Sequence, residues 1–291
     1  MTELNNRALP NLPPAARGLG AALARPKTVA VLCVVAITAL GWSWLALAVA
    51  GMAGPAAPLD FWPPAFTALC QPTFGLAVPE GSWGLSGFAV VGLMWGAMVL
   101  AMMLPSAGPM IFTYAEIADT AARKQEPIVS PVVLAAGYAT IWLGFSVLTT
   151  FAQFGFTRAA LLDAHMTSAS ASFSGAIFIA AGAYQFSSLK HACLRRCRSP
   201  FSFFFANWQT RARGVFRLGV RQGLYCLGCC WAMMAVMFAV GVMNVIWMAA
   251  LGIVMTVEKM ITGRRFSQAI GAALIAGGVI FTSAHWPLWP I

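Results

Sequence analysis

Residues 222–241 read QGLYCLGCCWAMMAVMFAVG, twenty consecutive positions without a charged side chain. An uncharged apolar run of this length is what an α-helix needs to cross the hydrocarbon core of a bilayer. Comparable runs recur along the 291 residues, of which 60% are hydrophobic and only 9% are charged. A soluble domain carries about 25% charged residues. The sequence therefore predicts an all-α, polytopic membrane helix bundle.

We predict about seven transmembrane helices, which together form a single domain over residues 29–284. The predicted spans are 29–50, 86–115, 131–157, 172–189, 222–241, 243–261 and 267–284. We expect residues 1–28 to form a disordered cytoplasmic tail, because they are polar and contain several prolines. They lack the apolar segment of a cleavable signal peptide, so the first span is expected to act as its own insertion signal. Residues 285–291 form a short tail on the outer side in this interpretation.

The net charge of +10 is explained by membrane topology. With the N-terminus in the cytoplasm, 17 of the 18 lysines and arginines fall in cytoplasmic connections, and only Arg158 falls outside. Basic residues near span ends stay in the cytoplasm, so the predicted orientation is N-in and C-out. We expect a multi-pass protein of a cell membrane, such as a bacterial inner membrane. Lipid is the expected partner, a protein partner is left unidentified, and no nucleic-acid recognition module is present.

Sulfur side chains concentrate on one face of the quoted stretch. On a helix, four of them share an arc of about 60° that extends about 16 Å along the axis. These four are Cys226, Cys230, Met233 and Met237. Cys229 lies at the edge of the same face, so this span presents a ladder of thiols and thioethers.

A second thiol pair follows the fourth span, in the segment KHACLRRCRSP. Cys193 and Cys197 are four residues apart, share a helical face, and lie on the same predicted side as Cys226. The cytoplasm is reducing, so the thiols should stay free of disulfides, and the surrounding arginines should lower their pKa values. Thiolates and thioethers are soft donors suited to copper(I), while thiolates alone also suit zinc. The predicted metal ligands are Cys193, Cys197, Cys226, Cys229 and Cys230.

Further candidate ligands lie on apolar helices. The methionines concerned are Met94, Met98, Met102, Met233, Met237, Met248 and Met255. Methionine also fills gaps in apolar cores, so packing is the alternative interpretation. Glu258 shares a predicted face with Met248 and Met255, and a carboxylate at membrane depth indicates a functional role. The alternative is an ion pair of Glu258 with Lys259 or a loop arginine.

Two prolines interrupt the second span. Pro105 and Pro109 each remove a backbone donor, so we expect the helix to kink or unwind between them. Broken helices at membrane depth often border a binding site. A purely structural kink is the alternative.

Three stretches resemble a bacterial family described as predicted metal-binding integral membrane proteins. They are GLMWGAMVLAMMLPSAGPM (92–110), YQFSSLKHACLRRCRSP (184–200) and GLYCLGCCWAMMAVMFAVGVMNVIWMAALGIVMTVEK (223–259). The resemblance covers residues 84–284. It implies a membrane protein that binds a metal ion.

Three functions follow as hypotheses. The first is binding of a soft metal, with copper(I) as the favoured ion, for transport, delivery or assembly of another protein. The second is thiol–disulfide exchange, because Cys226 and Cys229 have the CxxC spacing of redox motifs, although the surrounding thioredoxin-like βαβ pattern is absent from the sequence. The third is a structural subunit without a ligand, in which the sulfurs only pack. No nucleotide-binding loop or hydrolytic triad points to another enzyme class.

Overall fold

The computed structural model describes residues 31–43 apart from 33 and 37, residues 83–162 apart from 128, and residues 168–283 apart from 243. Regular structure in this part of the chain is helical, and an isolated β-bridge joins Leu162 to Ser168. The longer helices are α4 (Leu85–Arg123), α5 (Pro131–Arg158), α6 (Ala171–Gln185), α9 (Ala212–Ala235), α11 (Val245–Met260) and α12 (Arg265–Ser283). The shorter ones are α7 (Ser188–Arg198), α8 (Pro200–Ala206) and α10 (Met237–Val240). The predicted all-α class is confirmed, whereas both predicted tails lie outside the described residues.

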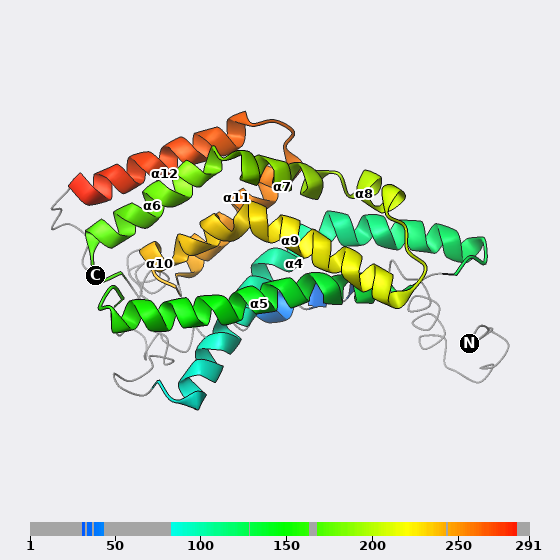
Figure 1. The fold of residues 1–291 in the computed structure, drawn as a ribbon, viewed down its shortest axis with the longest axis horizontal. Helices are drawn as coiled ribbons and strands as arrows, with labels where there is room; N and C mark the ends of the chain where they lie inside the picture. Colours follow the sequence, from blue (N-terminus) through cyan, green and yellow to red (C-terminus); the bar gives the residue numbers. More distant parts are fainter. Residues whose placement is uncertain are drawn as a thin grey trace, which may run out of the picture.

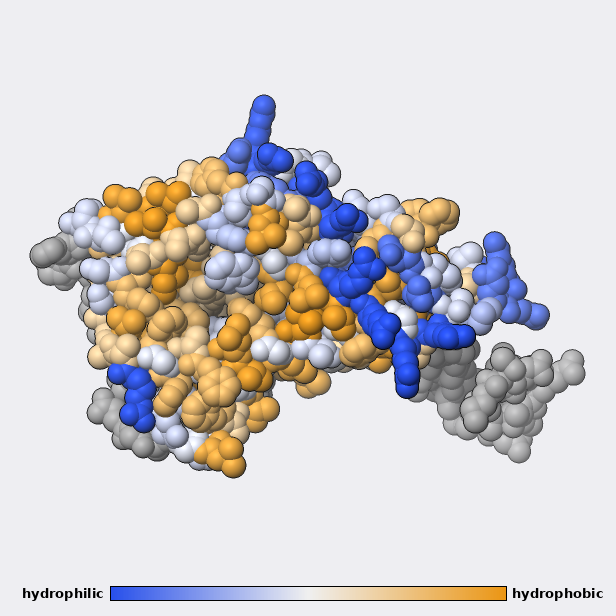
Figure 2. Space-filling view, in the orientation of Figure 1, coloured by the Kyte–Doolittle hydropathy of each residue, from blue (hydrophilic) through white to orange (hydrophobic). Residues whose placement is uncertain are grey.

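Within the described residues, four segments are long and apolar enough to cross a membrane. They are Leu85–Ala121, Pro131–Arg158, Ala212–Val240 and Arg265–Ser283. Their outer surfaces carry large apolar side chains, and Leu148 on α5 and Ile280 on α12 are each 64% exposed. Figure 2 shows that strongly hydrophilic side chains gather mainly over the region of α7, α8 and the beginning of α9. This distribution suits contact of the apolar surface with lipid.

The structure divides residues 172–189, one of the predicted spans, between two helices. Helix α6 ends at Gln185, and α7 begins at Ser188 after a break. The Ser187 side chain accepts a hydrogen bond from the Lys190 backbone N–H at 3.1 Å and so caps a new helix. Helices α6 and α11 have 15 and 16 residues, fewer than the roughly 20 that a straight span needs.

Helix α4 is the longest element, with 39 residues, and both prolines lie inside it. The helix is continuous through Pro105 and Pro109, while its two halves run in different directions in Figure 1. Ser106 Oγ donates to the Met103 carbonyl oxygen at 2.8 Å, which adds a polar contact at the bend. The segment therefore kinks without unwinding.

Glycines set the spacing of two helix pairs. On α9, a Cβ at Gly219 would lie 2.1 Å from the carbonyl oxygen of Leu134 on α5. On α6, a Cβ at Gly182 would lie 2.7 Å from the carbonyl oxygen of Gly271 on α12, and Figure 1 shows these helices side by side. Such backbone contact requires a residue without a side chain. The α5–α9 contact brings the cysteine-bearing half of α9 against α5.

Candidate metal centre

Three thiols meet on α9. Cys226, Cys229 and Cys230 are each at most 2% exposed, and their sulfur atoms all lie within 4.8 Å of one another. Cys229 Sγ and Cys230 Sγ are 3.3 Å apart. Residues three and four positions apart lie on the same face of a helix, so the CxxCC spacing gathers these thiols on one side of α9.

A fourth thiol comes from a separate segment, α7. Cys197 Sγ lies 4.0 Å from Cys229 Sγ, although the two residues are 32 positions apart in the sequence. Cys193, one turn earlier on α7, lies against the α9 backbone, where a Cβ at Gly228 would be 2.7 Å from its sulfur. The structure thus brings four of the five predicted cysteine ligands together and places the fifth beside them. We call Cys197, Cys226, Cys229 and Cys230 the thiol cluster.

The surroundings of the two α7 thiols raise their pKa values, whereas the sequence predicted lower ones. Burial raises the pKa of the Cys193 thiol. The pKa of the Cys197 thiol is raised well above its ordinary value, first by its hydrogen bond with Cys226 and also by burial. The prediction of lower pKa values is wrong because the hydrogen bond and burial outweigh the charge of Arg198, which interacts with Cys197 and Cys229. A metal ion that binds here must displace protons from these thiols.

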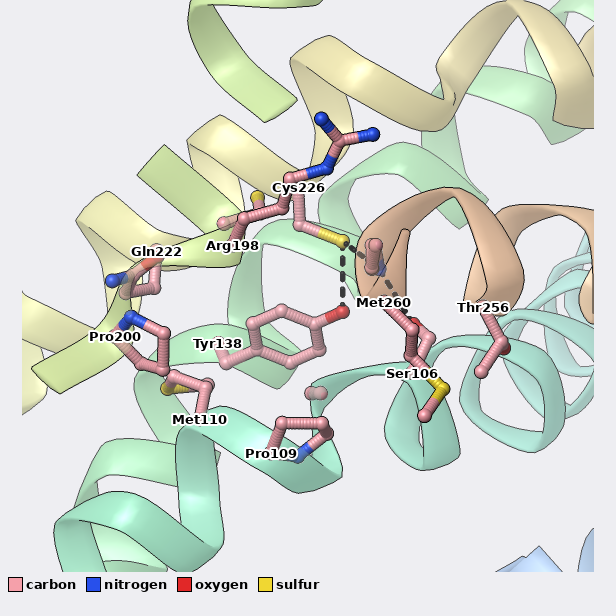
Figure 3. A pocket seen from close by; sticks show the side chains of 13 residues that line it. Ser106, Pro109, Met110, Tyr138, Arg198, Pro200, Gln222, Cys226, Thr256 and Met260 are labelled. Atoms are coloured by element: carbon pink, nitrogen blue, oxygen red, sulfur yellow. Dashed lines mark hydrogen bonds between the residues drawn. The ribbon is translucent and has the colours of Figure 1, made fainter. Parts of the chain in front are cut away.

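Polar groups from three other helices surround Cys226. Its Sγ lies 3.0 Å from Tyr138 Oη on α5 and 3.1 Å from Lys259 Nζ on α11. Lys259 Nζ also donates to Ser106 Oγ on α4 at 2.7 Å, and Figure 3 shows these contacts as dashed lines. Sequence reasoning did not assign Tyr138 or Lys259 to the site. A signal was present, since both are polar side chains within largely apolar helices.

Glu258 is engaged by a buried lysine. Lys190 Nζ lies 2.8 Å from Glu258 Oε2 and 3.0 Å from Oε1, with the two side chains 0% and 2% exposed. Lys190 also donates to Gln185 Oε1, and Arg198 Nη2 donates to the backbone carbonyl of Glu258 at 2.6 Å. The ion-pair alternative is therefore observed, and the partner is Lys190 in place of the expected Lys259 or loop arginine. The structure places this carboxylate in an ion pair, and its ligation of metal stays a prediction.

All seven candidate methionines are buried: Met94, Met98, Met102, Met233, Met237, Met248 and Met255. Met233 Sδ accepts a hydrogen bond from Gln185 Nε2 at 2.7 Å. Met102 packs on α11, where a Cβ at Gly252 would lie 3.8 Å from its Cε. These positions suit core packing, and metal ligation by the methionines stays a prediction.

A cavity of about 300 Å³ opens beside the thiol cluster. Its wall includes Cys197 and Cys226, the Lys259 side chain, and Gln222 one turn before Cys226 on α9. Pro109 from the kinked segment of α4 also lines it, as Figure 3 shows. The proline kink of α4 therefore borders the candidate site.

The geometry of the thiols suits a single soft ion. Two thiolates that bind one zinc ion, each about 2.3 Å from it, lie at most about 4.6 Å apart. The separations of 3.3 Å between Cys229 and Cys230 and 4.0 Å between Cys197 and Cys229 fall within that limit, and the three α9 sulfurs lie within 4.8 Å of one another. Small side-chain movements would bring the trio onto one ion. The donor set accepts copper(I) and zinc alike.

The comparison with known families agrees with this chemistry. A model of the PpoB2 family, described as copper chaperone, matches residues 92–281, a range that includes the thiol cluster and the cavity. No curated protein and no solved structure matches the chain. The metal-related family that the resemblance predicted is confirmed. Because the match covers well over half of the 291 residues, the chain belongs to the PpoB2 copper chaperone family.

Proposed function

We propose that this protein binds copper(I) at the thiol cluster within a membrane and delivers it to a protein partner. The observation that carries the proposal is the meeting of four thiols from two segments, α7 and α9, with three of them buried. Membership of the copper chaperone family supports both the ion and its delivery.

Copper(I) suits the surroundings better than zinc does. The cavity beside the cluster is also lined by Met110 and Met260, and thioethers select copper(I) over zinc. We assign the seven buried methionines to weaker binding stations along the helices, since movement of an ion requires sites that release it. We assign to Glu258 a role in the charge balance of the site, in which its carboxylate neutralises the buried ammonium of Lys190. Zinc is the alternative ion.

Delivery is favoured over permanent storage by the position of the cavity. Cys197 and Cys226 line it, so an incoming ligand can reach the bound ion. The trio lies in Ala212–Val240, one of the four segments that suit a membrane. We therefore propose an integral membrane protein that holds copper(I) on the buried face of α9 and makes it accessible through the cavity beside Cys226.

Metal analysis of the purified protein tests the proposal. The test variant is Cys226→Ser/Cys229→Ser/Cys230→Ser, and the control is Cys33→Ser/Cys70→Ser, which leaves all five predicted cysteine ligands intact. After anaerobic loading with copper(I), the control should retain near-stoichiometric copper and the triple variant should lose it. Equal, sub-stoichiometric copper in both proteins would refute the proposal.

The same samples distinguish the thiol–disulfide alternative. Differential alkylation under oxidising and reducing conditions reports reversible pairing of Cys226 and Cys229. Copper binding without a reversible disulfide supports the chaperone function. A reversible disulfide at a cellular potential, in a protein that binds no copper, would support the redox function instead.

A further inference from the structure

Helix α8 presents two phenylalanines to the outside of the protein. Phe201 and Phe205 are 63% and 82% exposed, and their rings stack with their centroids 6.3 Å apart. The other side of the helix is fixed to the bundle, because Phe204 is buried and its ring packs on Tyr114 of α4. An exposed aromatic pair on an element that is held in place is typical of an interaction surface.

Arginines without acidic partners lie on both sides of α8 in the chain. Two exposed arginines lie near the end of α7, and three lie at the beginning of α9: Arg195, Arg196, Arg211, Arg213 and Arg217. The sequence has no acidic residue between Asp163 and Glu258, and Glu258 is already paired with Lys190. Figure 2 shows the hydrophilic side chains grouped over this region, with apolar surface directly beside them. The surface therefore combines unbalanced positive charge with exposed apolar groups.

Helix α9 relates this surface to the membrane. Arg221 directly precedes the uncharged run 222–240, which belongs to the segment Ala212–Val240 that suits a membrane. Its guanidinium carbon lies 5.5 Å from the centre of the Phe203 ring on α8, and its Nη1 donates to Asn207 Oδ1 at 3.2 Å. Basic side chains at the end of an apolar span lie at the level of the lipid headgroups. The contacts of Arg221 therefore hold α8 at that level.

We infer that Phe201, Phe205 and the five arginines form a binding surface for anionic phospholipid, which we call the lipid surface. A guanidinium donates two parallel hydrogen bonds to the oxygens of one phosphate, and a headgroup without a cation of its own leaves the phosphate charge free for arginine. The two phenylalanines enter the adjoining acyl chains, as the apolar side chains of interfacial helices do. This inference rests on the membrane location in the proposed function and is independent of copper.

The test measures which lipids the full-length protein retains. The protein is reconstituted in nanodiscs that contain equal amounts of phosphatidylglycerol and phosphatidylcholine, and native mass spectrometry counts the lipids that stay bound after release. The wild type should retain more phosphatidylglycerol. In Arg213→Gln/Arg217→Gln, the ratio of phosphatidylglycerol to phosphatidylcholine should fall by at least about fivefold, the effect of one basic side chain at an anionic surface.

Two further variants separate charge from apolar contact. Arg213→Lys/Arg217→Lys keeps the charge at the same positions and is the matched control, so it should keep the preference for phosphatidylglycerol. Phe201→Ser/Phe205→Ser should lower the retention of both lipids and leave their ratio unchanged.

An equal lipid ratio in the glutamine and lysine variants overturns the lipid surface. It leaves the proposed function standing, because copper binding is measured separately on the same proteins. A wild-type protein that does not enter nanodiscs overturns both the lipid surface and the membrane location. Polyglutamate, added to the protein in detergent, tests an acidic protein as the partner. Its binding through Arg213 and Arg217, in a protein without a lipid preference, would assign the surface to an acidic protein and overturn the lipid assignment.

Discussion

Lys259 Nζ lies 3.1 Å from Cys226 Sγ, so a lysine faces the thiol cluster directly. A cation in a largely buried site needs a partner of opposite charge. The adjacent carboxylate, Glu258, is engaged by Lys190 instead. The charge of Lys259 is therefore directed to the thiols and to Ser106, and it offsets the negative charge that thiolates bring to a copper(I) complex.

Replacement of Lys259 should weaken copper binding. Lys259→Met removes a charge-assisted hydrogen bond to Cys226, which is worth about 1.5 kcal/mol, or roughly tenfold in affinity. Competition with a chromogenic copper(I) chelator measures the change. Lys124→Met, at an exposed position after α4, is the control and should match the wild type. An unchanged affinity in Lys259→Met would show that the ammonium does not stabilise the bound ion.

Glu258→Gln should destabilise the fold and leave copper binding intact. The substitution leaves Lys190 buried without its carboxylate partner, and loss of one member of a buried ion pair costs about 3–5 kcal/mol. Denaturant unfolding in detergent measures the loss, and Glu126→Gln, an exposed carboxylate, is the control. The opposite pattern, with normal stability and lost copper, would make Glu258 a metal ligand.

Local sequence patterns predicted the helical class and the thiol face of α9, because both depend on spacing within one helix. The CxxCC spacing alone placed Cys226 and Cys230 on one side. The break after Gln185 was missed, although Gln185, Ser187 and Ser188 make the end of the predicted span more polar than the rest of it. Ser187 was its local signal, as the residue that caps α7.

The polar surroundings of the thiols could not be predicted from spacing. Tyr138 and Lys259 reach Cys226 from α5 and α11, which are distant in the sequence. Their meeting depends on how closely the helices pack and on the direction of α4 beyond its prolines. The closeness of α5 and α9, for example, is set by a long-range backbone contact between Gly219 and Leu134.

The two α7 cysteines should differ in their importance. Cys197 Sγ lies 4.0 Å from Cys229 Sγ, whereas Cys193 packs over the backbone of Gly228. Cys197→Ser should lower copper(I) affinity by at least about tenfold, since even indirect supports of metal ligands have effects of that size. Cys193→Ser is the matched control on the same helix and should bind copper normally. Equal losses in both variants would assign Cys193 to the ligand set as well.

Gly219→Ala should disturb both the fold and the metal centre. The added Cβ would lie 2.1 Å from the Leu134 carbonyl oxygen and 3.0 Å from the Tyr138 backbone nitrogen, so α5 and α9 must separate. Overpacking of this kind costs about 1–3 kcal/mol or more. The shift also moves Tyr138 away from Cys226, so copper affinity should fall together with stability.

Gly144→Ala is the matched control for this change. It lies on α5 as well, but a Cβ there meets no atom within 4 Å. Alanine is favoured over glycine in a helix by about 1 kcal/mol, so this variant should be as stable as the wild type or more so. Thermal unfolding and copper titration on both proteins measure the contrast. If Gly219→Ala matched Gly144→Ala in both measurements, the close contact of α5 with α9 would not hold Tyr138 against the thiol cluster.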